Sequence, residues 1–248
     1  MNIDKERFIT GGVLIVVVAL IAWIDSFFLT WAFLGIAFMF SFYEAMKLYS
    51  VNDNKMYTYA TLLWIFAFFY PNPDDLIFVA LIVAISYMLY LGRVEVKDFY
   101  PLLYPTTSFL FLLALYKGFG IEALIWLTIV VALTDTGAYF SGKAIGKRKF
   151  NPISPKKTWE GVIGGVVLAS LFGAWYGSEF VSFFLAFFIS ALVSISSVFG
   201  DLYESFLKRS AGVKDSGSIL PGHGGVLDRV DGFMFASVMM VVMLRGLA

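Results

Sequence analysis

The chain has 248 residues, of which 60% are hydrophobic and only 15% are charged. A soluble domain usually carries about 25% charged residues, so this composition indicates a protein embedded in a membrane. Basic and acidic residues number 18 each, so the formal net charge is zero, and no basic run favours nucleic acid as a partner. The absence of cysteine and the single histidine exclude disulfides, thiolate nucleophiles and multi-histidine metal sites.

Nine apolar segments are candidates for membrane-spanning helices, since a helix needs roughly 20 mostly apolar residues to cross the hydrocarbon core. In chain order they lie near 8–24, 27–46, 56–71, 76–92, 99–116, 119–140, 159–176, 180–200 and 233–247. The first segment resembles a signal peptide, but no cleavage site follows it, so we interpret it as a retained helix. Only Asp25 and Ser26 separate the first two segments, which predicts a tight hairpin. Pro101 and Pro105 predict a kink or a delayed start in the fifth.

Basic residues predict the orientation of these helices. With a cytoplasmic N-terminus, sixteen of the 18 lysines and arginines fall on the cytoplasmic side, among them Lys5, Arg7 and Arg93. Only Lys117 and Arg245 fall outside, as the positive-inside rule expects. The fold class predicted is therefore all-α: a polytopic integral membrane protein with about nine transmembrane helices, its N-terminus cytoplasmic and its C-terminus outside.

Polar residues are distributed unevenly along the chain. Residues 1–133 have short loops and form a lipid-embedded scaffold in this interpretation. Residues 134–248 contain two long segments predicted to be cytoplasmic, 141–158 and 201–232, which are rich in Gly, Lys, Arg and Asp, so we expect this part to be the catalytic membrane region. We expect both parts to belong to one structural domain.

The second cytoplasmic segment combines acidic and basic residues at a high density. Its acids are Asp201, Glu204, Asp215, Asp228 and Asp231, and its bases are Lys208, Arg209, Lys214 and Arg229. Asp201 and Glu204 are three residues apart, as are Asp228 and Asp231, and residues at this spacing share one face of a helix. Hard oxygen ligands favour Mg²⁺ over zinc, and Lys and Arg bind phosphate oxygens. The pattern indicates metal-assisted phosphoryl or nucleotidyl transfer; the alternative is a solvated loop whose charges only pair with one another.

The same segment resembles the signature of the phosphatidate cytidylyltransferases, or CDP-diacylglycerol synthases. The matching positions are Ser205, Lys208-Arg209, Lys214-Asp215, Pro221, His223-Gly224-Gly225 and Asp228-Arg229-Val230-Asp231. The resemblance extends upstream to 154–161 and 135–139, whereas the N-terminal segments resemble the family only in being apolar helices. It implies CTP and phosphatidate as substrates, a homodimer, and a multi-pass protein of the bacterial inner membrane with its active site facing the cytoplasm.

The predicted site residues fall into three groups. We assign the metal to three acids, Asp201, Asp228 and Asp231, with Asp135 or Asp215 contributing, and expect Mg²⁺ as the cofactor, with a second cation left open. The catalytic set comprises these three and Lys208, Arg209, Lys214, Asp215, His223 and Arg229. The substrate-binding set comprises Asp135, Lys156, Lys157, Ser205, Gly224 and Gly225.

Several polar residues outside the second segment have two interpretations. Asp135 lies in an apolar helix and faces either water or a polar cavity. Lys156 and Lys157 precede a helix start and either anchor it to anionic lipid or bind phosphates. Thr158 is a candidate N-cap for that helix. Glu44 lies near the cytoplasmic end of the second segment, where we expect it at the membrane interface.

The predicted reaction is attack of a phosphatidate oxygen on the α-phosphorus of CTP, which forms CDP-diacylglycerol and releases pyrophosphate. A phosphomonoester is already ionised at neutral pH, so no strong general base is needed. Two alternatives remain. A CTP-dependent kinase of a membrane polyprenol-type lipid would release CDP, and a transporter would place charge near the bilayer midplane in paired broken helices.

Overall fold

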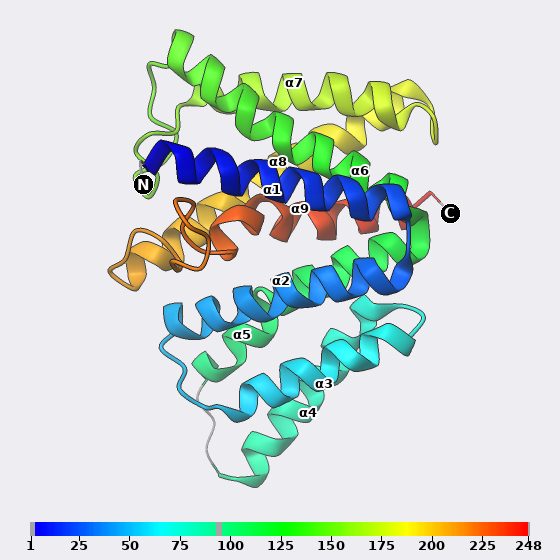
Figure 1. The fold of residues 1–248 in the computed structure, drawn as a ribbon, viewed down its shortest axis with the longest axis vertical. Coiled ribbons are helices and arrows are strands. Elements are labelled where there is room, and N and C mark those ends of the chain that lie inside the picture. The colour runs from blue at the N-terminus through cyan, green and yellow to red at the C-terminus, as the bar shows by residue number, and fades with distance from the viewer. Residues whose placement is uncertain (1–2, 93–95, 248) are drawn as a thin grey trace. The chain divides into compact units, whose positions relative to one another are not determined.

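The computed structural model describes residues 3–92 and 96–247, without the side chains of residues 3–7 and 96. The first half contains α1 (Ile3–Ile24), α2 (Phe27–Leu48), α3 (Lys55–Phe69), η1 (Pro73–Asp75), α4 (Leu76–Tyr90), η2 (Val96–Phe99) and α5 (Tyr100–Leu103). The second half contains α6 (Thr106–Ile145), α7 (Trp159–Gly177), α8 (Phe183–Ser210) and α9 (Leu227–Arg245). The described part of the chain is thus helical, without a β-strand, as the sequence predicts (Figure 1).

Within the described residues, five stretches are long and apolar enough to cross a membrane. They are Phe27–Leu48, Pro73–Tyr90, Lys97–Ile145, Trp159–Gly177 and Phe183–Ser210, and Phe8–Ile24 is a shorter apolar helix. Large apolar side chains are exposed on several of these helices, for example Phe78 at 66% and Phe184 at 86%. Exposed apolar surface of this kind marks a membrane or partner contact. The chain is therefore a helical membrane protein, whereas the count of nine spans and the orientation of the termini stay predictions.

The predicted breaks between helices are largely found in the structure. Helix α1 ends at Ile24 and α2 begins at Phe27, which confirms the tight hairpin. Helix α6 begins at Thr106, directly after Pro105, and Gly120 interrupts it with φ 78° and ψ −176°. In segment 201–232, α8 continues to Ser210 and α9 begins at Leu227, so the pairs Asp201/Glu204 and Asp228/Asp231 both lie on helices, as their spacing predicts. Arg93, which contributes to the predicted charge bias, lies outside the described residues, as do the side chains of Lys5 and Arg7.

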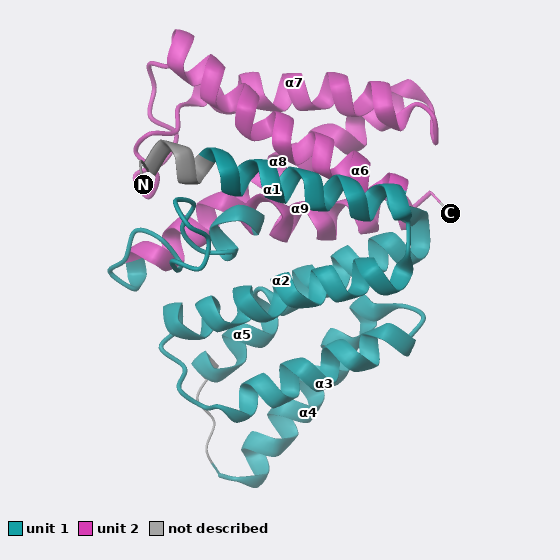
Figure 2. Ribbon diagram, in the orientation of Figure 1, with its two compact units in different colours: residues 1–121, 210–230 teal, residues 122–209, 231–248 magenta. Residues whose placement is uncertain are grey.

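The chain forms two compact units, coloured separately in Figure 2. Unit 1 contains Met1–Ile121 and Ser210–Val230, and unit 2 contains Glu122–Arg209 and Asp231–Ala248. Segment 210–230, which the sequence groups with the catalytic region, therefore packs in the first unit. The predicted functional boundary at residue 133 stays a prediction.

Unit 1 has an aromatic core around α2. Phe38 packs against Trp64 of α3 and Phe109 of α6, with ring centroids 5.2 and 5.5 Å away. The carbonyls at the C-terminal end of α3 accept hydrogen bonds from Lys117 Nζ, at 2.9 Å for Phe68 and 2.6 Å for Tyr70. These contacts satisfy helix-end carbonyls that have no intrahelical partner.

Small residues bring the helices of unit 2 into close contact. A Cβ built on Gly165 of α7 would lie 2.4 Å from the Thr134 carbonyl oxygen of α6, and one on Gly137 would lie 2.9 Å from the Gly165 Cα. Close backbone approach through small residues is how helices associate in membranes, where lipid is as apolar as the helix faces. A buried hydrogen bond also joins α6 to α8, since Thr134 Oγ1 and Ser194 Oγ lie 2.6 Å apart.

Candidate active site

Helices α8 and α9 meet through two glycines in unit 2. A Cβ on Gly200 would lie 2.5 Å from the carbonyl oxygen of Asp231, and one on Gly232 would lie 2.7 Å from Ser197 Oγ. The glycines therefore allow the two backbones to approach more closely than any larger residue would permit. Since Asp201 directly follows Gly200, this contact brings the carboxylates of Asp201 and Asp231 into one region.

Three acidic side chains of unit 2 interact electrostatically. The charges of Asp201 on α8 and Asp135 on α6 both act on the carboxyl of Asp231 on α9, and the Lys208 ammonium partly compensates them. Like charges gathered in a partly desolvated site repel one another, so the group favours a bound cation. The structure thus brings Asp135 together with two of the three predicted metal ligands.

A cavity of about 480 Å³ lies beside these acids in unit 2. Its polar and charged lining residues are Thr134, Asp135, Tyr139, Lys143, Lys156, Lys157, Thr158 and Asp201. Carboxylates and lysines on the walls of one cavity suit a polyphosphate bound with a cation. Lys143, which the sequence interpretation does not include in the site, also lines it.

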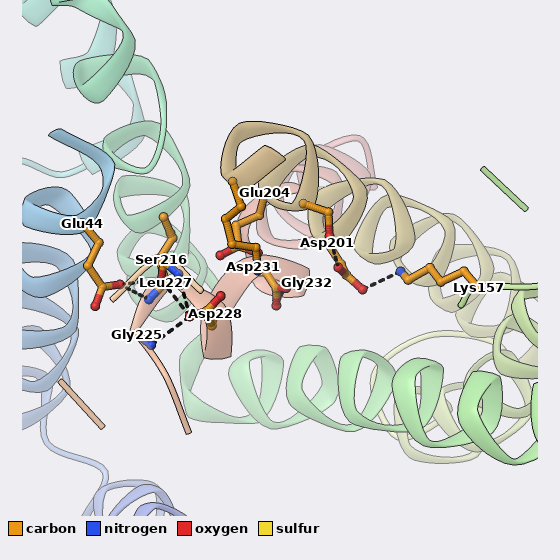
Figure 3. A network of polar contacts seen from close by, with 12 residues as sticks. Glu44, Lys157, Asp201, Glu204, Ser216, Gly225, Leu227, Asp228, Asp231 and Gly232 are labelled. Atoms are coloured by element: carbon orange, nitrogen blue, oxygen red, sulfur yellow. Dashed lines mark hydrogen bonds and ion pairs between the residues drawn. The ribbon is translucent and has the colours of Figure 1, made fainter. Parts of the chain in front are cut away.

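Lys157 lies in the segment between α6 and α7 and is held by an ion pair with α8. Its Nζ forms an ion pair with Asp201 Oδ2 at 2.5 Å (Figure 3), and both side chains are largely shielded, at 20% and 26% exposure. Glu160 stabilises this segment, because its Oε2 accepts hydrogen bonds from the backbone N–H groups of Lys147 and Arg148 at 3.0 and 3.2 Å.

The start of α7 confirms the predicted N-cap. Thr158 Oγ1 accepts a hydrogen bond from the Gly161 N–H at 3.1 Å and so satisfies one of the unpaired donors of the first turn. The predicted phosphate-binding lysines therefore precede a well-defined helix start.

The last two turns of α8 carry a further group of predicted residues. Ser205 Oγ donates to Asp201 Oδ1 at 3.3 Å, so Ser205 contacts the acidic group rather than standing apart from it. The fully buried Glu204 forms an ion pair with Lys208 one turn later. Lys208 is therefore fixed beside the acids, whereas the Arg209 side chain is exposed.

In unit 1, the loop between α8 and α9 folds around Asp228. Asp228 Oδ2 accepts hydrogen bonds from the backbone N–H groups of Ser216 and Gly225, at 2.9 and 2.8 Å (Figure 3). Gly224 adopts φ +84°, and a Cβ there would lie 2.8 Å from Asp228 Oδ2. The two glycines of the His-Gly-Gly motif thus shape this loop. A cation bound by Asp228 would compete with these donors or use Oδ1.

The remaining predicted residues of unit 1 differ in exposure. Lys214, Asp215 and Arg229 are exposed, so their side chains are accessible to a soluble ligand. His223 is half-buried, and its Nδ1 has no hydrogen-bond partner among the residues that the structure describes. A Cβ on Gly11 of α1 would lie 3.6 Å from His223 Nε2, so the imidazole lies close to α1.

The predicted site residues thus form two sets. Unit 2 holds Asp135, Lys156, Lys157, Asp201, Ser205, Lys208, Arg209 and Asp231; unit 1 holds Lys214, Asp215, His223, Gly224, Gly225, Asp228 and Arg229. Helix α9 links them covalently, because Asp228 is its second residue and Asp231 its fifth. The individual catalytic, substrate and metal roles stay predictions.

The acids of unit 2 fit a magnesium ion by the chemistry of their donors. Across residues 3–92 and 96–247, no three Asp, Glu, Cys or His side chains form a metal ligand set by themselves. Mg²⁺ does not require one, since it usually keeps several waters and binds one or two carboxylates together with substrate phosphates. Asp201 and Asp231 would therefore meet this requirement for a cation that arrives with a polyphosphate.

A second cavity of unit 2, of about 530 Å³, is apolar. It lies along α7 and α8, and among its lining residues are Trp159, Val162, Ile163, Val166, Val167, Ile195, Val198, Phe199 and Leu202. Val162 and Val198 also line the charged cavity, so the two cavities adjoin. A polar cavity beside an apolar one suits an amphipathic ligand.

The fold and the site together define a helical membrane protein with a cavity lined by carboxylates and lysines. The chain belongs to the cytidylyltransferase family, whose model matches residues 5–247. It is 44% identical to the phosphatidate cytidylyltransferase of Helicobacter pylori J99 over 97% of this chain and 92% of that protein. It is 36% identical to the phosphatidate cytidylyltransferase of Bacillus subtilis 168 over 70% of this chain and 72% of that protein.

Proposed function

We propose that this protein is a phosphatidate cytidylyltransferase, which converts CTP and phosphatidate into CDP-diacylglycerol and pyrophosphate. The observation that carries the proposal is the cavity of unit 2, where Asp135 and Asp201 lie with Lys143, Lys156 and Lys157. Its relatives from Helicobacter pylori and Bacillus subtilis bear this name, and the first matches nearly the whole chain.

The reaction needs positioning more than acid–base chemistry. A phosphate oxygen of phosphatidate forms a bond to the α-phosphorus of CTP, and the bond from that phosphorus to the bridging oxygen breaks, so pyrophosphate leaves. The attacking oxygen is already ionised near neutral pH. The lysines of the cavity lower the repulsion between the two anions and hold them in line, which is the main task of the protein in such transfers.

Mg²⁺ is the cofactor that we propose for this site. Asp201 and Asp231 would hold it in unit 2, and Asp228 stays a predicted third ligand. When bound, the ion would neutralise charge on the triphosphate and on the leaving pyrophosphate.

The apolar cavity is the proposed place for an acyl chain of phosphatidate. It adjoins the charged cavity through Val162 and Val198, so a lipid phosphate in the charged cavity would have its chains near α7 and α8. Burying an acyl chain there contributes binding free energy of about 0.8 kcal/mol for each methylene removed from water.

We further propose nine spans with the N-terminus and the active site on the cytoplasmic side of the inner membrane. The bias of basic residues supports this orientation, and CTP would then reach the site from the cytosol. A homodimer is implied by the family resemblance alone.

The test uses the purified protein in detergent with phosphatidate, Mg²⁺ and CTP labelled at the α-phosphate. We expect label to move into the lipid with one pyrophosphate released for each labelled lipid. Appearance of CDP with a polyprenol acceptor, and no pyrophosphate, would establish a kinase instead. Absence of turnover with either acceptor would favour a transporter.

A further inference from the structure

Glu44 is a buried acid outside every predicted site. It lies on α2, and only 1% of its surface is exposed. The placement of Glu44 at the membrane interface stays a prediction, and the structure adds that its side chain is packed inside unit 1. A buried carboxylate is costly unless its oxygens accept hydrogen bonds, so its partners indicate its role.

Among the described residues, Glu44 accepts hydrogen bonds from the loop between α8 and α9 and from the start of α9, and Figure 3 shows Ser216 and Leu227 beside its carboxylate. Glu44 Oε1 accepts from the Val226 N–H at 3.0 Å, and Oε2 accepts from the Leu227 N–H at 2.8 Å. Leu227 is the first residue of α9, and the first N–H groups of a helix have no intrahelical acceptor. Glu44 thus caps α9 across a separation of 183 residues in the sequence, and its charge is favourable at that end of the helix dipole.

Two glycines allow the loop to close around the Glu44 carboxylate. A Cβ on Gly217 would lie 2.4 Å from Glu44 Oε1, and one on Gly225 would lie 2.5 Å from Glu44 Oε2. No other residue would fit at either position without displacing the acid or the loop. The conformation of the loop and the position of Glu44 are therefore mutually dependent.

Ser216 connects Glu44 to the signature acid Asp228. Its Oγ lies 2.9 Å from Glu44 Oε2 and 3.0 Å from Asp228 Oδ2. A hydroxyl has one proton, so it donates to one carboxylate at a time, while the Ser216 N–H holds Asp228 throughout. The orientation of Asp228 thus depends on a loop that Glu44 fixes from α2.

We propose that Glu44 is a positioning residue for cytidylyl transfer. It does not contact substrate; it holds residues 214–228 in the conformation that presents Lys214, Asp215 and Asp228. This inference rests on the proposed function, and it assigns to the N-terminal helices a part in the active site beyond that of a lipid-embedded scaffold.

The test is the variant Glu44→Gln, which keeps the side-chain length but replaces one acceptor oxygen with an NH₂ donor facing a backbone donor. We expect kcat/KM for CTP to fall about 10²-fold, because a displacement of about 1 Å in catalytic groups has an effect of that size. The KM for CTP should rise and the KM for phosphatidate should stay unchanged. If the substitution only reduced the fraction of folded Glu44→Gln protein, the maximal rate would fall and both KM values would stay unchanged. The control Glu122→Gln makes the same change at an exposed position of α6. It should leave kcat/KM for CTP and the KM values for CTP and phosphatidate unchanged.

Hydrogen–deuterium exchange of the same proteins provides a readout independent of activity. In Glu44→Gln, the amides of 216–227 should exchange faster, while those of 147–159, held by Glu160, should not change. If Glu44→Gln does not fold, Ser216→Ala is the second variant, because it removes only the shared hydroxyl. It should lower kcat/KM for CTP about threefold to tenfold and should also speed the exchange of the amides of 216–227.

Wild-type kinetics in Glu44→Gln, or unchanged exchange in 216–227, would overturn the proposal. So would wild-type kinetics in Ser216→Ala, were that the variant measured. If the wild-type protein itself transferred no label to lipid, the proposed function would fail, and the exchange data would still show whether Glu44 holds the loop.

Discussion

A single methyl group on Gly200 should displace Asp201 and Asp231 relative to one another. In Gly200→Ala, the new Cβ would lie 2.5 Å from the Asp231 carbonyl oxygen, whereas ordinary contacts begin at 3.4 Å. The neighbour is backbone, so it cannot rotate away, and α9 must shift by roughly 1 Å in a closely packed interior. A shift of this size should lower kcat about 10²-fold, and the overpacking should cost about 1–3 kcal/mol of stability.

The assay is transfer of α-labelled CTP into lipid, measured together with the thermal unfolding midpoint of the detergent-solubilised protein. Gly118→Ala is the matched control, because no atom outside its own helix turn lies within 4 Å of the added Cβ. It should keep full activity and gain about 0.5–1 kcal/mol, as expected when alanine replaces a helical glycine. Wild-type kcat in Gly200→Ala would refute the reasoning, because the helix contact would then not control the site.

Three further changes test other parts of the site. Lys157→Gln removes the ion pair with Asp201 and should raise the KM for CTP about tenfold, whereas the exposed Lys149→Gln should not; equal effects would contradict the role of Lys157. Asp231→Asn should require at least tenfold more Mg²⁺ for half-maximal rate, and a Mg²⁺ dependence like that of the exposed control Asp75→Asn would exclude Asp231 as a ligand. Thr158→Ala should lower the stability of the protein by about 1 kcal/mol through the lost N-cap, and an unchanged unfolding midpoint would show that the cap is unimportant.

Much of this protein could be predicted from local patterns in the sequence. Long apolar segments predict helices, because a backbone in lipid must satisfy its hydrogen bonds internally. Asp25-Ser26 and Pro105 mark helix ends that the structure confirms. The Thr158 cap was also predictable, since donor and acceptor are three residues apart. The signature spacing, carried by one continuous segment, indicates the family that the comparisons show.

The tertiary structure alone decided which of these residues act together. The role of Glu44 depends on hydrogen bonds to residues more than 170 positions away, and an isolated acid near the end of an apolar segment carries no signal of such partners. The contact of Gly200 with Asp231, likewise, depends on how α8 and α9 cross, and a glycine in a helix predicts neither its neighbour nor its distance. Helices and motifs follow from interactions between residues close in sequence, whereas burial, long-range ion pairs such as Lys157–Asp201 and shared cavities arise only when distant segments pack.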